Sequence, residues 1–310
     1  VDVLGTIRAG DDGVSFGTLT IAGRGGATTG ELGGNHGVVI GAGATVSTTG
    51  GAVSITGTGA AVNGIEAGVV LAGLVQTASA VGHPGDVAVE GFGGGSASTP
   101  GSSGNYGIWV EPTGRVLTDA GSVSAIGHEG VGNPLGFFPF TDSPGLWFDN
   151  GVVQSATGAL AFTADSFWAD ISAGGAIGTA DTVSIRNLVA GQAIELGADM
   201  NPLLAGIAAS RIVVGRTDVQ PVIYQAAPPD GTLVLAAGTA LELAGSSISL
   251  RAPIATPGAG QIYRGAVHLG DLLPTADVTL TASSARFTST VDGGGRSLSI
   301  LGGAEFDGAV

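Results

Sequence analysis

A three-part unit recurs along the first half of the chain and constrains the fold more than any other feature. Its last part is a glycine-bounded burst such as Gly51-Ala-Val-Ser-Ile-Thr-Gly57 or Gly121-Ser-Val-Ser-Ala-Ile-Gly127, in which apolar and small polar residues alternate. The first apolar position of this burst returns at intervals of 34, 34 and 36 residues, at Leu19, Val53, Val87 and Val123. A fixed order of short segments at such a period is typical of a solenoid, and we expect these four residues to stack in one inward column.

Two further bursts precede it in each unit. Asn105-Tyr-Gly-Ile-Trp-Val110 matches Asn35-His-Gly-Val-Val-Ile40, and weaker counterparts occur at 67–71 and 144–148. The middle burst, Arg115-Val-Leu-Thr-Asp119, returns at 44–48, 74–77 and 152–155. All three bursts alternate with period two, which is typical of strands, and no helical stripe accompanies them. We therefore predict an all-β fold, a parallel β-solenoid with about three strands per coil.

The spacing between candidate strands becomes shorter past about residue 160. We expect residues 1–160 to form long-loop coils with a repeat of about 34–38 residues, and residues 161–310 to continue the β-helix with shorter coils. Glycine-rich or proline-containing turns separate the candidate strands of this second part. These strands are 182–185, 193–196, 211–214, 233–235, 241–243, 248–250, 261–263, 278–281, 286–288, 298–300 and 305–306.

Charge and composition restrict the classes of partner that the chain can bind. The formal net charge is −15 and all ten basic residues are arginines, which argues against nucleic acid and anionic membranes as partners. The chain has no cysteine for a disulfide framework, and its longest apolar run, near 67–75, is too short to span a membrane. It lacks a signal peptide and an initiating methionine, so we expect a processed product or a segment of a longer chain.

Several segments resemble repeats of large filamentous-haemagglutinin-like adhesins. They include "GTLTIAGRGG" with "GNHGVVIGAG", "GDVAVEGFGGG" with "GNYGIWVEPTG", and the stretches at 191–215 and 261–310. The resemblance implies a right-handed parallel β-helix (β-solenoid) that is exported to the bacterial cell surface, with extracellular adhesion or assembly into a filament or layer as its role. The amino-terminal secretion domain of such proteins is not recognisable, which leaves the export route open.

The predicted function is therefore extracellular and non-enzymatic. The alternative is a β-helical polysaccharide lyase or glycoside hydrolase, which would need several carboxylates or arginines in one groove. Asp11-Asp12 reads as turn chemistry, and Asp142 and Asp149 read as solvated loop residues. His36 stands where another unit has Tyr106, which favours packing at a coil corner. We predict no catalytic residue, no metal and no cofactor.

One aromatic-rich stretch is not explained by the repeat. Residues 133–148, "NPLGFFPFTDSPGLWF", hold five of the sixteen aromatic residues: Phe137, Phe138, Phe140, Trp147 and Phe148. They either cover the side of the helix, together with Trp168, or form an exposed patch that binds a ligand. The expected partners are further repeats or neighbouring copies of the chain, and possible ligands are a neutral glycan or a protein of a host or neighbouring cell.

Overall fold

A computed structural model gives the fold and shows two compact units, Val1–Ala180 and Asp181–Val310. It describes residues 1–10, 16–26, 34–61, 65–95, 104–130, 144–171, 174–188, 194–196, 200–216, 222–224, 231–269 and 277–310.

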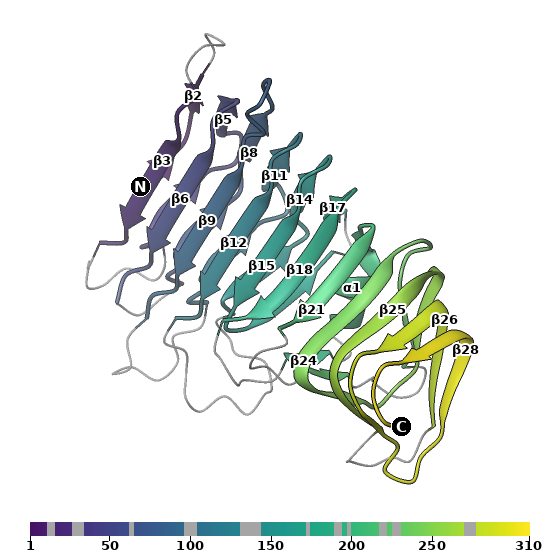
Figure 1. The fold of residues 1–310 in the computed structure, drawn as a ribbon. Helices are drawn as coiled ribbons and strands as arrows, with labels where there is room; N and C mark the ends of the chain where they lie inside the picture. The colour runs from purple at the N-terminus through teal and green to yellow at the C-terminus, as the bar shows by residue number, and fades with distance from the viewer. Residues whose placement is uncertain are drawn as a thin grey trace. The chain divides into compact units, whose positions relative to one another are not determined.

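The first unit is a β-solenoid in which successive coils add strands to three parallel sheets (Figure 1). The first sheet contains β1 (Asp2–Val3), β4 (Val38–Ile40), β7 (Val69–Leu71), β10 (Ile108–Val110), β13 (Leu146–Asp149) and β16 (Phe167–Asp170). The second contains β2 (Thr6–Ala9), β5 (Thr45–Thr49), β8 (Leu74–Ala78), β11 (Arg115–Thr118), β14 (Val152–Ser155) and β17 (Ala176–Thr179). The third contains β3 (Leu19–Arg24), β6 (Val53–Thr58), β9 (Val87–Phe92), β12 (Val123–His128) and β15 (Leu160–Ala164). The predicted solenoid with about three strands per coil is confirmed.

Equivalent residues of successive coils form inward columns. In the third sheet, parallel pairing joins Leu19 to Val53, Val53 to Val87, Val87 to Val123 and Val123 to Leu160. The side chains from Val53 onward in this column are at most 2% exposed. The predicted column is therefore confirmed, and it shows why the same residue type returns at each repeat: each side chain must fit between its counterparts in the coils on either side.

Glycines return at one corner because two segments of the coil meet there. A Cβ atom on Gly91, in β9, would lie 2.0 Å from the carbonyl oxygen of Gly107, just before β10. The same approach recurs between Gly57 and Gly68 at 1.9 Å, and between Gly127 and Gly145 at 2.0 Å. No side chain fits at such distances, so the glycines that punctuate the repeat are sterically required.

A column of hydroxyl side chains joins the second and third sheets. Its members, at matching register positions, are the buried residues Thr48, Thr77, Thr118, Ser155 and Thr179. Their hydroxyls donate to glycine carbonyl oxygens at the corner between these sheets, for example from Thr48 to Gly51 at 2.6 Å and from Thr118 to Gly121 at 2.5 Å. Ser155 and Thr179 donate to the corner glycine of the preceding coil, Gly121 and Gly158 respectively. Each hydroxyl thus satisfies a backbone group that the tight turn leaves without a strand partner.

The number of residues per coil changes within the first sheet. The step from Ile108 to Leu146 is 38 residues, whereas the step from Leu146 to Phe167 is 21. The pairing of the strands is the same in both steps, so the difference lies in the length of the connections. The boundary between the two units, after Ala180, follows this change.

The second unit uses longer strands. It contains β18 (Thr182–Asn187), β19 (Ile194–Leu196), α1 (Met200–Gly206), β20 (Ile207–Ala208), β21 (Arg211–Gly215), β22 (Val222–Tyr224), β23 (Leu233–Val234), β24 (Ala240–Leu250), β25 (Ile254–Leu269), β26 (Val278–Phe287), β27 (Val291–Asp292) and β28 (Leu298–Phe306). Strands β18, β21, β24, β25, β26 and β28 pair in parallel and in sequence order. Register shifts, such as the one between Thr256 and Gly260, bend β25 so that one strand runs along more than one side of the coil.

Candidate ligand-binding face

Strand β13 places two of the predicted aromatic residues on opposite sides of the first sheet. Phe148 is only 2% exposed and faces the interior, whereas the neighbouring Trp147 is half-buried and faces outward. Phe137, Phe138 and Phe140 lie outside the described residues, as do Asp11, Asp12 and Asp142. The binding patch therefore stays a prediction, with Trp147 at the surface and Phe148 in the core.

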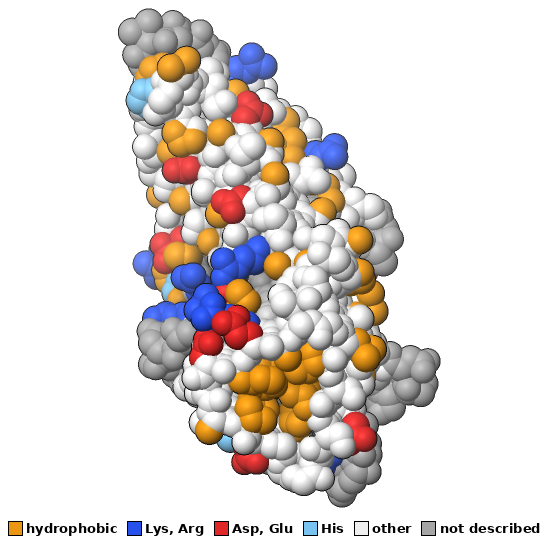
Figure 2. Space-filling model, turned by 45° about the vertical axis from the view of Figure 1, so that its right-hand side comes forward, with side chains coloured by type: hydrophobic (Ala, Val, Ile, Leu, Met, Phe, Trp, Pro, Cys, Tyr) orange, Lys and Arg blue, Asp and Glu red, His pale blue; other side chains and the backbone are white. Residues whose placement is uncertain are grey.

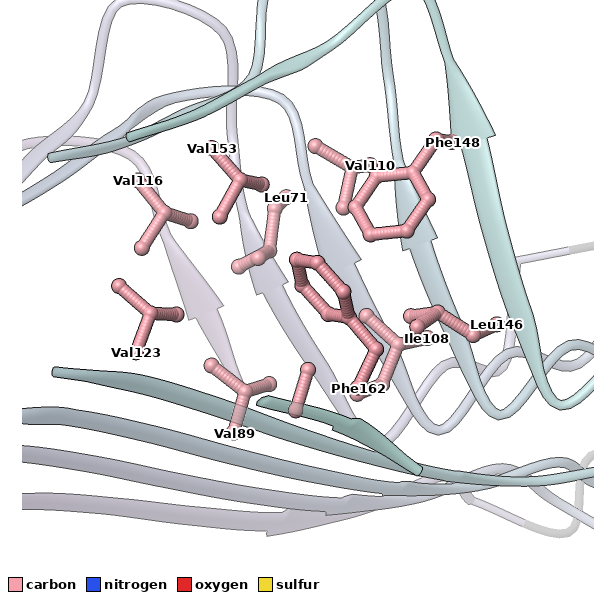
Figure 3. Close-up of a pocket in the computed structure, with 11 residues that line it drawn as sticks. Leu71, Val89, Ile108, Val110, Val116, Val123, Leu146, Phe148, Val153 and Phe162 are labelled. Atoms are coloured by element: carbon pink, nitrogen blue, oxygen red, sulfur yellow. The ribbon is translucent and has the colours of Figure 1, made fainter. Parts of the chain in front are cut away.

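Phe148 borders a small apolar cavity inside the first unit (Figure 3). Its ring meets that of Phe162 edge to face, with centroids 5.2 Å apart. The cavity offers only about 10 Å³, near the lower limit for one water molecule, and every lining side chain is apolar. It is a packing gap between large and small core residues, and it has neither the room nor the polar groups to bind a ligand.

The three tryptophans of the chain, Trp109, Trp147 and Trp168, stack on the outer side of the first sheet. The ring centroids of Trp109 and Trp147 are 4.9 Å apart, with 7° between the planes. Those of Trp147 and Trp168 are 5.6 Å apart, with 25° between the planes. Tyr106 packs beside them, 4.6 Å from Trp147. We call the three indoles the tryptophan column; Trp168 is its most exposed member, at 43%.

A row of carboxylates runs beside the tryptophan column. Asp149 and Asp170 each follow a tryptophan of the column by two residues within their strands, so strand alternation places them on the same outer side. Glu111 follows Trp109 by two residues and lies directly after the end of β10, near enough to Asp149 to sense its charge. Asp149 and Asp170 are paired in register, and Asp170 is exposed. Burial, and after it the charge of Asp149, raises the pKa of Glu111. We call these three residues the carboxylate row.

A separate pair of carboxylates, Glu129 and Asp165, lies at a corner of the same unit. Burial raises the pKa of Glu129, a hydrogen bond from Ser166 opposes this rise, and the charge of Asp165 adds to it. The Ser166 hydroxyl donates to Glu129 Oε2 at 3.1 Å, and the Glu129 backbone N–H donates to Asp165 Oδ2 at 3.1 Å. Both carboxylates thus make contacts that join neighbouring coils.

The coil corner predicted for His36 also holds a buried acid. His36 is half-buried, its Nδ1 accepts the backbone N–H of Ala67 at 3.1 Å, and burial lowers its pKa against the opposing charge of Asp2. Next to Ala67, Glu66 is fully buried at the position that Asn35 and Asn105 occupy in the adjacent coils. Burial raises the pKa of Glu66, and hydrogen bonding with Asn35 offsets part of this rise.

The other histidines lie in separate places. His128 stacks on Phe92 at 4.1 Å, and its Nε2 lies 3.3 Å from Glu90 Oε1. The ring of His83 stacks on Phe16, and the ring of His268 lies near the carboxylate of Asp292. In the part of the chain that the structure describes, no group of three or more histidine or acidic side chains could hold a metal ion.

The second unit contains ion pairs that were not apparent from the sequence. The Glu242 side chain is only 7% exposed and contacts Arg211, while Arg264 Nε donates to its Oε1 at 2.8 Å. Arg286 pairs with Asp307 at 2.9 Å and lies 3.6 Å from Glu305. Basic and acidic side chains gather side by side in this manner on the face drawn in Figure 2. These ion pairs join neighbouring strands, and the two arginines keep the buried Glu242 carboxylate from being an unpaired charge.

Comparison with known proteins adds no identity. No family model matches the chain, and neither a curated protein nor a solved structure matches it significantly. Among the described residues, no helix has both the length and the apolar character needed to cross a membrane.

Proposed function

We propose that the chain is an extracellular adhesive or structural segment of a large bacterial surface protein. It attaches the cell to a surface, or builds a filament or layer, and it does not catalyse a reaction. The tryptophan column carries this proposal, because it concentrates large aromatic side chains on the outer side of a rigid sheet, with Trp168 43% exposed. Aromatic residues held on rigid elements are the usual anchors of binding surfaces.

Charge restricts the ligand. At a net charge of −15 the surface repels polyanionic glycans, so the ligand is a neutral glycan or a protein.

The arrangement of the acidic residues favours binding over turnover. An acid–base pair must face a common space that a substrate can enter. Glu129 and Asp165 instead accept hydrogen bonds that join adjacent coils, and the cavity inside the first unit is lined only by apolar side chains.

Adhesion of beads that carry the chain tests the proposal. The variant Trp147→Ala/Trp168→Ala and the single variant Trp168→Ala are compared with Val39→Ala, a change in the same outward column but three coils from Trp147. Cells and an array of neutral glycans serve as targets, and circular dichroism verifies that each variant retains its β structure. We expect the tryptophan variants to lose adhesion and Val39→Ala to keep it. Equal adhesion by all variants would show that the column is not the binding face, and depolymerisation of a polysaccharide by the purified chain would refute the non-enzymatic role.

A further inference from the structure

We propose that the tryptophan column and the carboxylate row together form a docking strip for an arginine-bearing, extended segment of a partner protein. This inference rests on the proposed adhesive function and names the kind of partner that the face recognises.

Two parallel rows define the strip. Register pairing sets the backbones of successive tryptophans, and those of Asp149 and Asp170, about 4.8 Å apart along the stack of coils. The step from Trp147 to Asp149 along β13, or from Trp168 to Asp170 along β16, separates the rows by about 7 Å. A partner lying on this face therefore meets aromatic and negative groups at the same time, over three adjacent coils.

The stacking of the indoles decides between the two classes of ligand. The ring planes of Trp109 and Trp147 are nearly parallel, with 7° between them, so each ring covers a face of the other. A sugar packs its apolar side against the face of an aromatic ring, and a stacked column does not offer a row of such faces. The partner instead meets the outer edges of the rings and the exposed part of Trp168. The apolar contact that these ring edges offer therefore suits the aliphatic stem of a long side chain better than a chain of sugars.

The carboxylate row gives the sign of the charge. Asp149 lies close enough to Glu111 to raise its pKa, after the effect of burial, so the carboxylates of the row repel one another. A cation placed along the row would relieve this repulsion. The surrounding unit adds to the attraction, because residues 1–180 contain 14 acidic residues against 3 arginines, a formal net charge of −11.

Arginine fits both rows. Its planar guanidinium group donates in pairs to a carboxylate, and its long aliphatic stem can lie along apolar surface, whereas the ammonium group of lysine acts as a compact, strongly hydrated charge. A segment with arginines therefore places its guanidinium groups on the carboxylate row and its aliphatic stems against the outer edges of the indoles.

The three tryptophans provide the measurement, since no other tryptophan contributes to the fluorescence of the chain. Tryptophan emission is recorded while the full chain is titrated with a synthetic glycine–serine peptide carrying spaced arginines, and with matched peptides carrying lysine or glutamate. The variant Asp149→Asn/Asp170→Asn removes two charges of the row. Asp119→Asn makes the same kind of change at an exposed residue on the second-sheet side of the unit, and is the matched control.

We expect the arginine peptide to shift the emission, with affinity that falls as salt rises, and the lysine peptide to bind more weakly. The double variant should weaken binding about tenfold, the product of a few-fold for each of two exposed ion pairs, while Asp119→Asn stays within about twofold. Unchanged affinity of the double variant, equal binding of the glutamate peptide, or a shift given by a neutral oligosaccharide and not by the arginine peptide would overturn the proposal. Each of these outcomes leaves the adhesive function standing if the tryptophan variants still lose adhesion; if those variants keep adhesion, the proposed function itself fails.

Discussion

Trp109 and Trp147 stack with their ring centroids 4.9 Å apart and 7° between their planes, although 38 residues of chain separate them. The contact exists because β10 and β13 occupy the same position in successive coils. Each indole therefore lies directly against its counterpart, and a feature scattered along the sequence becomes one continuous column on the surface.

Coupling between the stacked indoles should be visible by circular dichroism. Indoles in contact couple their electronic transitions, and a couplet arises where the coupled transitions are skewed, as the 25° between the planes of Trp147 and Trp168 allows. We therefore expect the far-ultraviolet spectrum to contain an exciton couplet. Trp109→Phe or Trp147→Phe should each reduce the couplet, and the double variant should remove it. The phenylalanine rings keep some of the stacking, so the loss of stability should stay near 0.5–1.5 kcal/mol, roughly the value of one aromatic pair. A spectrum unchanged by either substitution would contradict the column.

Gly91→Ala should be strongly destabilising. The new Cβ would lie 2.0 Å from the carbonyl oxygen of Gly107, a backbone atom that cannot move without disturbing the neighbouring strand. We expect a loss of roughly 3 kcal/mol or more, measured by urea unfolding, or failure to fold. Gly5→Ala is the control, because a Cβ there meets no atom within 4 Å. Similar stability of the two variants would mean that the corner is wider than its geometry indicates.

Glu66→Gln should stabilise the protein at neutral pH. Burial raises the pKa of Glu66 above its ordinary value of 4.5, so the folded state binds a proton more tightly than the unfolded state. The favourable contribution of this group is then complete below pH 4.5 and is lost as the pH rises through the folded pKa. The glutamine variant should be about 1–3 kcal/mol more stable at pH 7 and should gain less on acidification.

Urea midpoints at a series of pH values between 7 and 4.5 check the Glu66 prediction, with 4.5 the ordinary value for glutamate. Asp119→Asn, at an exposed carboxylate, should leave the wild-type pH dependence in place. A glutamine variant that is less stable than the wild type at pH 7 would show that the buried carboxylate has a charged partner after all.

His36 should have the opposite pH dependence. Burial lowers its pKa below the ordinary 6.5, so acidification below that value protonates the unfolded state first and reduces stability. Protonation of Nδ1 would also remove the acceptor for the Ala67 N–H. His36→Tyr, which copies Tyr106 of another coil, should suppress this acid-dependent loss at pH values below the ordinary histidine pKa. At higher pH it should lower stability by a constant amount of about 1–3 kcal/mol, because the Ala67 N–H loses its acceptor. His268→Gln is the control, and the prediction fails if it alters the acid dependence as much as His36→Tyr does.

The repeat in the sequence was sufficient to predict the solenoid and the inward column. Stacked coils place equivalent residues against one another. The alternation within each burst and the glycines at the corners therefore recur in the sequence of each coil. The same alternation carried an overlooked signal: Trp147 and Phe148 are adjacent, so only one of them could face outward.

Tertiary structure alone decided which residues meet across coils where the connections vary. The step from Leu146 to Phe167 is 21 residues, not 38, and no fixed period would have aligned Trp168 with Trp147 or Asp170 with Asp149. The contacts of Glu242 with Arg211 and Arg264 likewise join strands separated by connections of unequal length. The physical reason is that strand pairing sets the register between coils, while the connections absorb any difference in length without leaving a periodic trace in the sequence.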